Sequence, residues 1–137
     1  MKIAASRAEA FLARLDASLR LILLYGPDSG LARERAEKLV HHVVGNLSDP
    51  FRVAEFRAEL LRGDPARLRD EAAALALMGG RRVIRLREAT DAAADTVADV
   101  LANAVGDSLI VIEAGELPAR SRLRRLCEES AIAAAVA

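Results

Sequence analysis

The sequence predicts an α/β fold in which a mainly parallel sheet of five strands lies between two layers of helices. Two observations favour this three-layer arrangement. Short apolar runs recur along the 137 residues, and longer amphipathic segments separate each run from the next. The most apolar run, residues 109–112, shows no alternation and is typical of a central strand buried on both faces. Strands that alternate with helices in this way form parallel sheets with helical crossovers.

The predicted elements can be placed in order along the chain. The first half has a short helix at 6–14, a strand at 21–25, a helix from about 30 to 44, and an alternating strand at 51–56. The second half has a helix from 64 to about 77, a strand at 82–86, a helix from about 90 to 105, a strand at 109–112, a helix from about 119 to 129, and a strand at 132–136. Asp64 is the expected N-cap of the third of these helices, with Pro65 at its first position, and Gly79-Gly80 ends that helix. Thr90 or Asp91 is expected to cap the next helix.

The amino-acid composition limits the classes of function that the chain can have. A chain of 137 residues with 53% hydrophobic and 29% charged residues is an ordinary globular domain, and its formal net charge is zero. Only four residues are aromatic, which argues against a stacking platform for single-stranded nucleic acid. The single cysteine, Cys127, excludes an internal disulfide and a cysteine-cluster metal site. Because no signal peptide or membrane-spanning run is visible, we expect a cytoplasmic location without membrane partners.

The turn after the first strand begins like a phosphate loop. In parallel α/β folds, ligands bind at the carboxyl ends of the strands. Counted from Gly26, a G-x-x-x-x-G-K-[ST] motif needs a second glycine, a lysine and a hydroxyl, and those places hold Leu31, Ala32 and Arg33. Arg33 could donate to an anion, although from the place of the metal-binding hydroxyl. The motif therefore lacks all three groups that hold phosphate and Mg²⁺.

Two neighbouring features support a degenerate loop. Pro27 and Gly30 fit a plain strand-to-helix turn, which we favour over anion binding. The candidate strands end in Arg87-Glu88 and Glu113-Ala114, so neither supplies an Asp-Glu pair for Mg²⁺ and water. The sequence predicts a degenerate P-loop NTPase domain without a cofactor. A divergent P-loop protein that still binds nucleotide is the alternative.

Several motifs, in order and at matching spacing, resemble those of the bacterial DNA polymerase III delta subunit. They are 24–31 with 33–36, Asp49-Pro50-Phe51, 64–68, 79–84, and 108–117 followed by 121–124. This resemblance spans nearly the whole chain. It implies the amino-terminal, AAA+-like domain of the wrench subunit of the clamp loader, occupying residues 1–137, with the lid and collar domains of the full-length subunit absent.

The resemblance also implies a function. In that family the subunit is a non-catalytic part of a DNA-directed DNA polymerase (nucleotidyltransferase) complex. It binds and opens the beta sliding clamp for loading onto primed DNA during DNA replication. The implied partners are the clamp and, through the missing carboxyl-terminal domain, the other clamp-loader subunits. DNA contact would be indirect or weak.

A short hydrophobic motif before the third strand binds the clamp in that family. Leu75, Leu77 and Met78 occupy its places, with Met78 where a phenylalanine is typical. The alternative is core packing at a helix end, above all for Leu75. Adjacent helical residues point in different directions, however, and Gly79 follows at once, which favours exposure of Leu77 or Met78.

Three further groups are better explained by structure than by function. The arginines of 120–125 could contact a phosphate backbone, but Glu128 and Glu129 balance them, so we favour a solvated helix face. His41 and His42 are expected on a helix surface because adjacent positions point apart. Cys127 is expected to be a small buried side chain.

Overall fold

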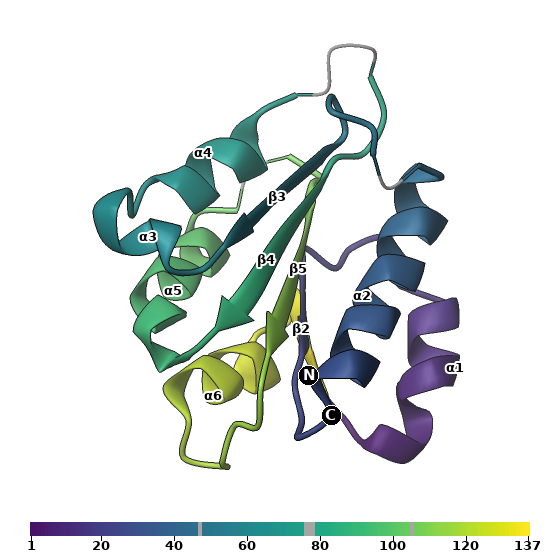
Figure 1. Ribbon diagram of the computed structural model, residues 1–137, viewed down its shortest axis with the longest axis vertical. Helices are drawn as coiled ribbons and strands as arrows, with labels where there is room; N and C mark the ends of the chain where they lie inside the picture. Colours follow the sequence, from purple (N-terminus) through teal and green to yellow (C-terminus); the bar gives the residue numbers. More distant parts are fainter. Residues whose placement is uncertain (47, 76–78, 105) are drawn as a thin grey trace.

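The chain folds around one parallel sheet (Figure 1). The computed structural model describes residues 1–46, 48–75, 79–104 and 106–137. Its strands are β1 (Lys2–Ile3), β2 (Leu21–Leu24), β3 (Val53–Arg57), β4 (Val83–Ala89), β5 (Leu109–Ala114) and β6 (Ala133–Val136), in the spatial order β1-β6-β2-β5-β4-β3. Every pair among these described strands is parallel.

The predicted three-layer α/β/α fold is confirmed, with a difference in strand number. The five predicted strands are β2 to β6, and the sixth is the two-residue strand β1, which pairs with β6. The sequence could not predict β1, because two residues are too short to show any hydrophobic period. The all-alanine stretch at the end of the chain is a strand, as predicted.

Helices cover both faces of the sheet (Figure 1). α1 (Ala8–Ala13), which follows a 3-10 turn at Ala5–Arg7, and α2 (Ser29–Val44) cover one face. α3 (Leu60–Gly63), α4 (Arg67–Ala73), α5 (Ala94–Ala102) and α6 (Arg122–Glu129) cover the other, with a 3-10 turn at Asp91–Ala93 before α5. None of the helices described is long and apolar enough to cross a membrane.

The central strands divide two hydrophobic cores between them. Along β2, Leu21 and Leu23 pack towards α5 and α6, whereas Ile22 and Leu24 pack towards α1 and α2. All six residues of β5, which lies between β2 and β4, are buried, so the prediction of a central strand is confirmed. Alternating side chains therefore anchor both helical layers to one rigid sheet.

The helix predicted from residue 64 to about 77 is wrong at both ends. Asp64 is not its N-cap but the residue after the short helix α3, which buries Leu61. α4 begins only at Arg67, whose N–H donates to the Asp64 carbonyl at 3.1 Å. It ends at Ala73, and Ala74 is already extended at ψ 143°. The short helix α3, which the sequence did not predict, ends directly before Asp64, so Asp64 follows one helix and does not start the next.

Candidate functional site

Residues 26–33 form a tight strand-to-helix turn. β2 ends at Leu24 and α2 begins at Ser29, so little chain is left for a phosphate cradle. Gly26, at φ 146°, donates its N–H to the Gly115 carbonyl at 3.1 Å. Asp28 is the N-cap of α2 and accepts from the Leu31 N–H at 3.0 Å. The carboxylate of Asp28 thus lies where an anion would meet the start of the helix.

The three residues in the decisive motif places lie on the first turns of α2. Leu31 is 38% exposed and Ala32 is buried. Arg33 points to solvent and pairs with Glu37 one turn later, with Arg33 Nε 3.2 Å from Glu37 Oε1. Arg33 is therefore the one cation of this turn that could reach an anion, and a carboxylate already faces it.

A hollow of about 290 Å³ lies at the carboxyl ends of β4 and β5, beside this turn. Its lining includes Gly30, Arg33, Arg87 and Glu113. Two carboxylates, Glu88 and Glu113, line this hollow, and Glu113 is buried. No cluster of three potential metal ligands occurs among the described residues.

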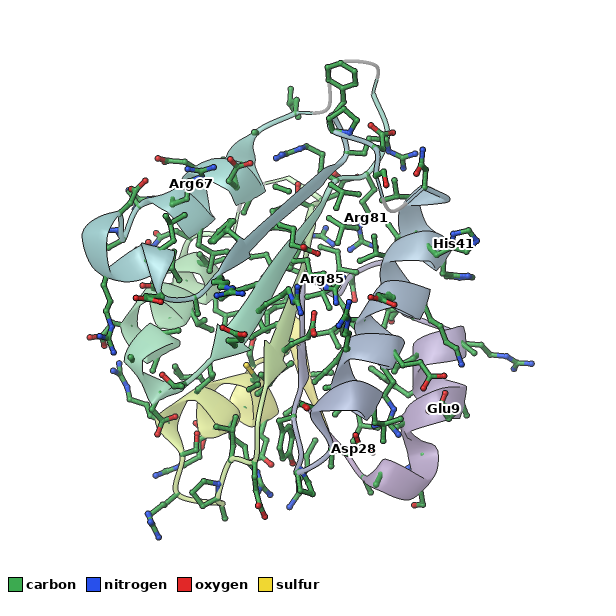
Figure 2. The ribbon with its side chains drawn as sticks, in the orientation of Figure 1. Glu9, Asp28, His41, Arg67, Arg81 and Arg85 are labelled. Atoms are coloured by element: carbon green, nitrogen blue, oxygen red, sulfur yellow. The ribbon has the colours of Figure 1, made fainter. Side chains whose placement is uncertain are left out.

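Glu113 is held by a buried arginine of the neighbouring strand. Arg85, whose side chain is 7% exposed, donates Nε to Glu113 Oε2 and Nη1 to Glu55 Oε1 at 3.0 Å. Its Nη2 lies 3.8 Å from Glu37 Oε1 on α2 and makes no hydrogen bond to the residues the structure describes. Figure 2 shows Arg85 between the sheet and α2. The Arg85 guanidinium supplies the positive charge that Glu113, Glu55 and Glu37 face.

The electrostatics of this pair follow from its surroundings. Burial by itself would lower the pKa of the Arg85 guanidinium, because charge is poorly solvated there. The hydrogen bond to Glu113 and the charges of Glu113, Glu55 and Glu37 outweigh burial and raise the pKa of Arg85 above its usual value. Arg85 therefore stays charged, and Glu113 could bind a metal ion only by giving up its hydrogen bond to Arg85.

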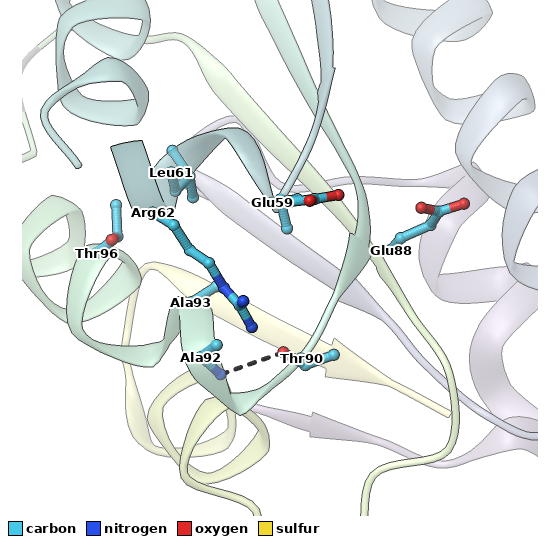
Figure 3. Close-up of a pocket in the computed structure, with 9 residues that line it drawn as sticks. Glu59, Leu61, Arg62, Glu88, Thr90, Ala92, Ala93 and Thr96 are labelled. Atoms are coloured by element: carbon cyan, nitrogen blue, oxygen red, sulfur yellow. Dashed lines mark hydrogen bonds between the residues drawn. The ribbon is translucent and has the colours of Figure 1, made fainter. Parts of the chain in front are cut away.

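A second hollow, of about 230 Å³, lies between α3 and the start of α5 (Figure 3). It is polar, with Arg62, Glu59 and Thr96 among its lining residues. Thr90 accepts from the Ala92 N–H at 3.3 Å, so it caps the 3-10 turn that leads into α5, whereas the N-cap position of α5 itself is Ala93. None of the predicted site residues that the structure describes lines this hollow.

Leu75, the described residue of the candidate clamp-binding motif, lies beyond the end of α4 and at the opposite end of the sheet from residues 26–33. β4 starts at this end, whereas residues 26–33 follow the carboxyl end of β2 (Figure 1). Leu75 is 89% exposed, which rules out the alternative that Leu75 packs in the core. Leu77 and Met78 lie outside the described residues, so their role stays a prediction.

The arginines of α6, the two histidines and Cys127 lie largely where the sequence analysis expected them. Arg124 and Arg125 pair with Glu128 and Glu129 one turn later, and Arg122 pairs with Asp95. His41 and His42 are exposed on α2. Cys127 is fully buried, and burial raises the pKa of its thiol to about 12.

The sequence reasoning missed Arg85, Asp28 and their partners. One signal was available, since Arg85 interrupts the apolar run of β4 and Glu113 follows that of β5. Two opposite charges inside neighbouring buried strands predict an ion pair. Asp28 precedes a helix and carries an ordinary N-cap signal.

Two solved structures share this fold. The Bacillus subtilis DNA clamp loader delta protein matches with a TM-score of 0.70 and 17% sequence identity, over 97% of this chain and 42% of that chain. A DNA polymerase III gamma subunit-related protein from Thermotoga maritima matches with a TM-score of 0.61 and 13% identity, over 97% of this chain and 45% of that one. No family model and no curated protein sequence matches.

The chain spans less than half the length of either structure. At these identities the likeness concerns the fold, and it agrees with the resemblance that the sequence motifs indicated. The degenerate phosphate-loop turn, the Arg85–Glu113 pair and the exposed segment at residue 75 are therefore set in a fold shared with clamp-loader proteins.

Proposed function

We propose that this chain is a non-catalytic clamp-loader domain of the DNA polymerase III complex, which binds the sliding clamp and opens it for loading. The observation that carries the proposal is the state of the phosphate-loop turn. Asp28 caps α2 where phosphate would bind, and Arg85 engages Glu113 beside it. A nucleotide site built this way is occupied by the protein's own charges, which supports a role without ATP hydrolysis.

In this proposal the clamp binds at the other end of the sheet, through Leu75, Leu77 and Met78. Leu75 is 89% exposed on an extended stretch beyond α4, as an insertion into an apolar pocket requires. Opening would follow from differential affinity. A domain that binds the opened ring about a hundredfold more tightly than the closed ring shifts that equilibrium by about 2.7 kcal/mol, without hydrolysis.

The test is a titration of the organism's own sliding clamp with the domain. We expect the wild-type chain to co-elute with the clamp on size exclusion and the variant Leu77→Ser with Met78→Ser to elute alone. Circular dichroism of the variant checks that the fold is intact. Equal binding by the variant would move the site elsewhere on the surface.

Nucleotide binding is the rival function, and the hollow beside Arg33 and Arg87 is the observation that favours it. The two arginines could attract phosphate, whereas Glu113 and Glu88 in the same lining repel it. Calorimetric titration with Mg-ATP separates the two functions. Micromolar binding would replace our proposal with the rival.

We expect the remaining partners to follow from the same proposal. Assembly with other clamp-loader subunits would depend on segments outside these 137 residues. Direct DNA binding is expected to be weak, because the described arginines of α6 are paired with carboxylates. A cytoplasmic location is the corresponding expectation.

A further inference from the structure

A buried arginine joins the end of α4 to the start of β4, the two elements between which Leu75 lies. Arg82, at the start of β4, is 7% exposed and reaches back to Glu71 on α4. It donates to both the backbone carbonyl and the carboxylate of Glu71, with Nη2 2.9 Å from Oε2. These residues are eleven positions apart, so their contact fixes the two ends of the intervening segment. Leu75, 89% exposed, lies shortly after Glu71, the α4 end of this contact.

The same arginine ties in a second loop. Arg82 Nε donates to the Phe51 carbonyl at 3.3 Å, just before β3. Arg52 continues the connection, since its Nε donates to the Arg81 carbonyl at 3.2 Å and its other nitrogens donate to the last carbonyls of α2. A Cβ on Gly80 would lie 3.0 Å from the Arg52 guanidinium carbon. The loop before β3 and the segment before β4 thus pack directly on each other.

The loop before β3 presents an aromatic side chain to solvent. All four aromatic residues of the chain lie within the described part, where Phe51 is 51% exposed, Tyr25 is buried, and Phe11 and Phe56 are half-buried. An exposed phenylalanine on a braced backbone loses little conformational freedom on binding, which is typical of an interface anchor.

The side chains at the amino end of the sheet indicate which class of partner could bind there. Four arginines lie here, but Arg20, Arg52, Arg81 and Arg82 all donate to backbone carbonyls. Arg81, for example, donates to the carbonyls of Asp107 and Leu19. Their charges are directed inward, so a phosphate backbone gains little from them. Among the described residues of these two loops, the large apolar side chains that are exposed are Phe51 and Leu75, and both fit an apolar pocket on a protein.

We propose that Phe51 is a second anchor of the clamp-binding surface, held beside the Leu75 segment by Arg82 and docking on the sliding clamp. This inference rests on the proposed function and names a residue that the hydrophobic motif does not contain. The hydrogen bonds of Arg82 to Glu71 and to the Phe51 carbonyl connect the end of α4, just before Leu75, with the loop that carries Phe51.

The experiment measures the affinity of the domain for the organism's sliding clamp by biolayer interferometry. Phe51→Ser is expected to weaken Kd about tenfold, equivalent to ~1.4 kcal/mol, and Leu75→Ser to weaken it as well. The matched control is Leu60→Ser, which removes a 43% exposed leucine from α3 at the far end of β3, and it should bind like wild type. Because Phe51 is half exposed in a loop, its replacement should leave the circular dichroism spectrum unchanged.

The outcomes separate the two proposals. If Phe51→Ser binds the clamp as tightly as wild type while Leu75→Ser binds more weakly, the second anchor is refuted and the proposed function stands. If the wild-type domain does not bind the clamp, the proposed function fails and the anchor fails with it. A primed-DNA arm covers the other partner, since DNA binding that depends on Phe51 would assign the ring to nucleic-acid stacking and overturn the inference.

Discussion

Removing the Arg85 guanidinium should destabilise the fold far more than removing a neighbouring surface arginine. In Arg85→Leu the Glu113 carboxylate, whose side chain is 10% exposed, is left buried without its partner. Breaking a buried pair on one side costs about 3–5 kcal/mol. Glu55 and Glu37 add little to this cost, because they are 44% and 40% exposed and can turn to solvent. We therefore expect a loss of about 3 kcal/mol in the free energy of unfolding, from the lower end of that range.

The double variant Arg85→Leu with Glu113→Leu tests the reason for that loss. Replacing both partners by apolar side chains is often neutral or stabilising, so most of the lost stability should return. Arg87→Leu is the matched control on the same strand. Its side chain is 31% exposed and its nearest contact to Glu55 is 3.9 Å, so its loss should stay below about 1 kcal/mol.

Urea denaturation followed by circular dichroism measures these differences. With a slope of about 2 kcal/mol per molar urea, the Arg85→Leu midpoint should fall by about 1.5 M, while the control moves by less than about 0.5 M. A shift of Arg85→Leu as small as that of Arg87→Leu would refute the buried pair. So would a double variant no more stable than the single one.

Three other changes give further tests. Asp28→Ala should cost about 1 kcal/mol of stability through the lost cap of α2, measured by urea denaturation, and should not create Mg-ATP binding in calorimetry. Glu71→Gln should destabilise at pH 7. The Arg82 hydrogen bond lowers the pKa of Glu71 below its usual 4.5, so the stability it gives is complete above pH 4.5, and the difference from wild type should shrink as pH falls further. Cys127, whose burial raises the thiol pKa to about 12, should resist a thiol reagent at pH 8 until urea unfolds the chain. Labelling of Cys127 in the folded protein would contradict its placement.

Hydrophobic period predicted most of the fold because each long element carries several turns or alternations of it. β2 and β5 are continuous apolar runs, and α2 shows apolar positions over sixteen residues. β1 and α3 were missed because elements of two and four residues contain too little pattern. The end of α4 was placed wrongly because its apolar residues continue past Ala73, whereas the Arg82 bonds to Glu71 are tertiary contacts.

In the candidate site, too, local features could be predicted from the sequence and contacts between distant residues could not. Local motif places were enough to predict that Leu31, Ala32 and Arg33 make a poor phosphate loop. The Arg85–Glu113 pair and the Arg82–Glu71 hydrogen bonds join strands and helices that are distant in the sequence, so only the fold brings them together. Phe51 looked like the start of a strand, and its exposure became visible once β3 was seen to begin at Val53.

One measurement separates clamp binding at the amino end of the sheet from clamp binding at its carboxyl end. Amide chemical shifts of the ¹⁵N-labelled domain should be recorded as the organism's sliding clamp is added. If the clamp binds as proposed, the changes will gather in the loops around Phe51, Leu75 and Gly80 and will spare residues 26–33. Changes confined to residues 26–33 and the strand ends beside them would contradict the proposed function.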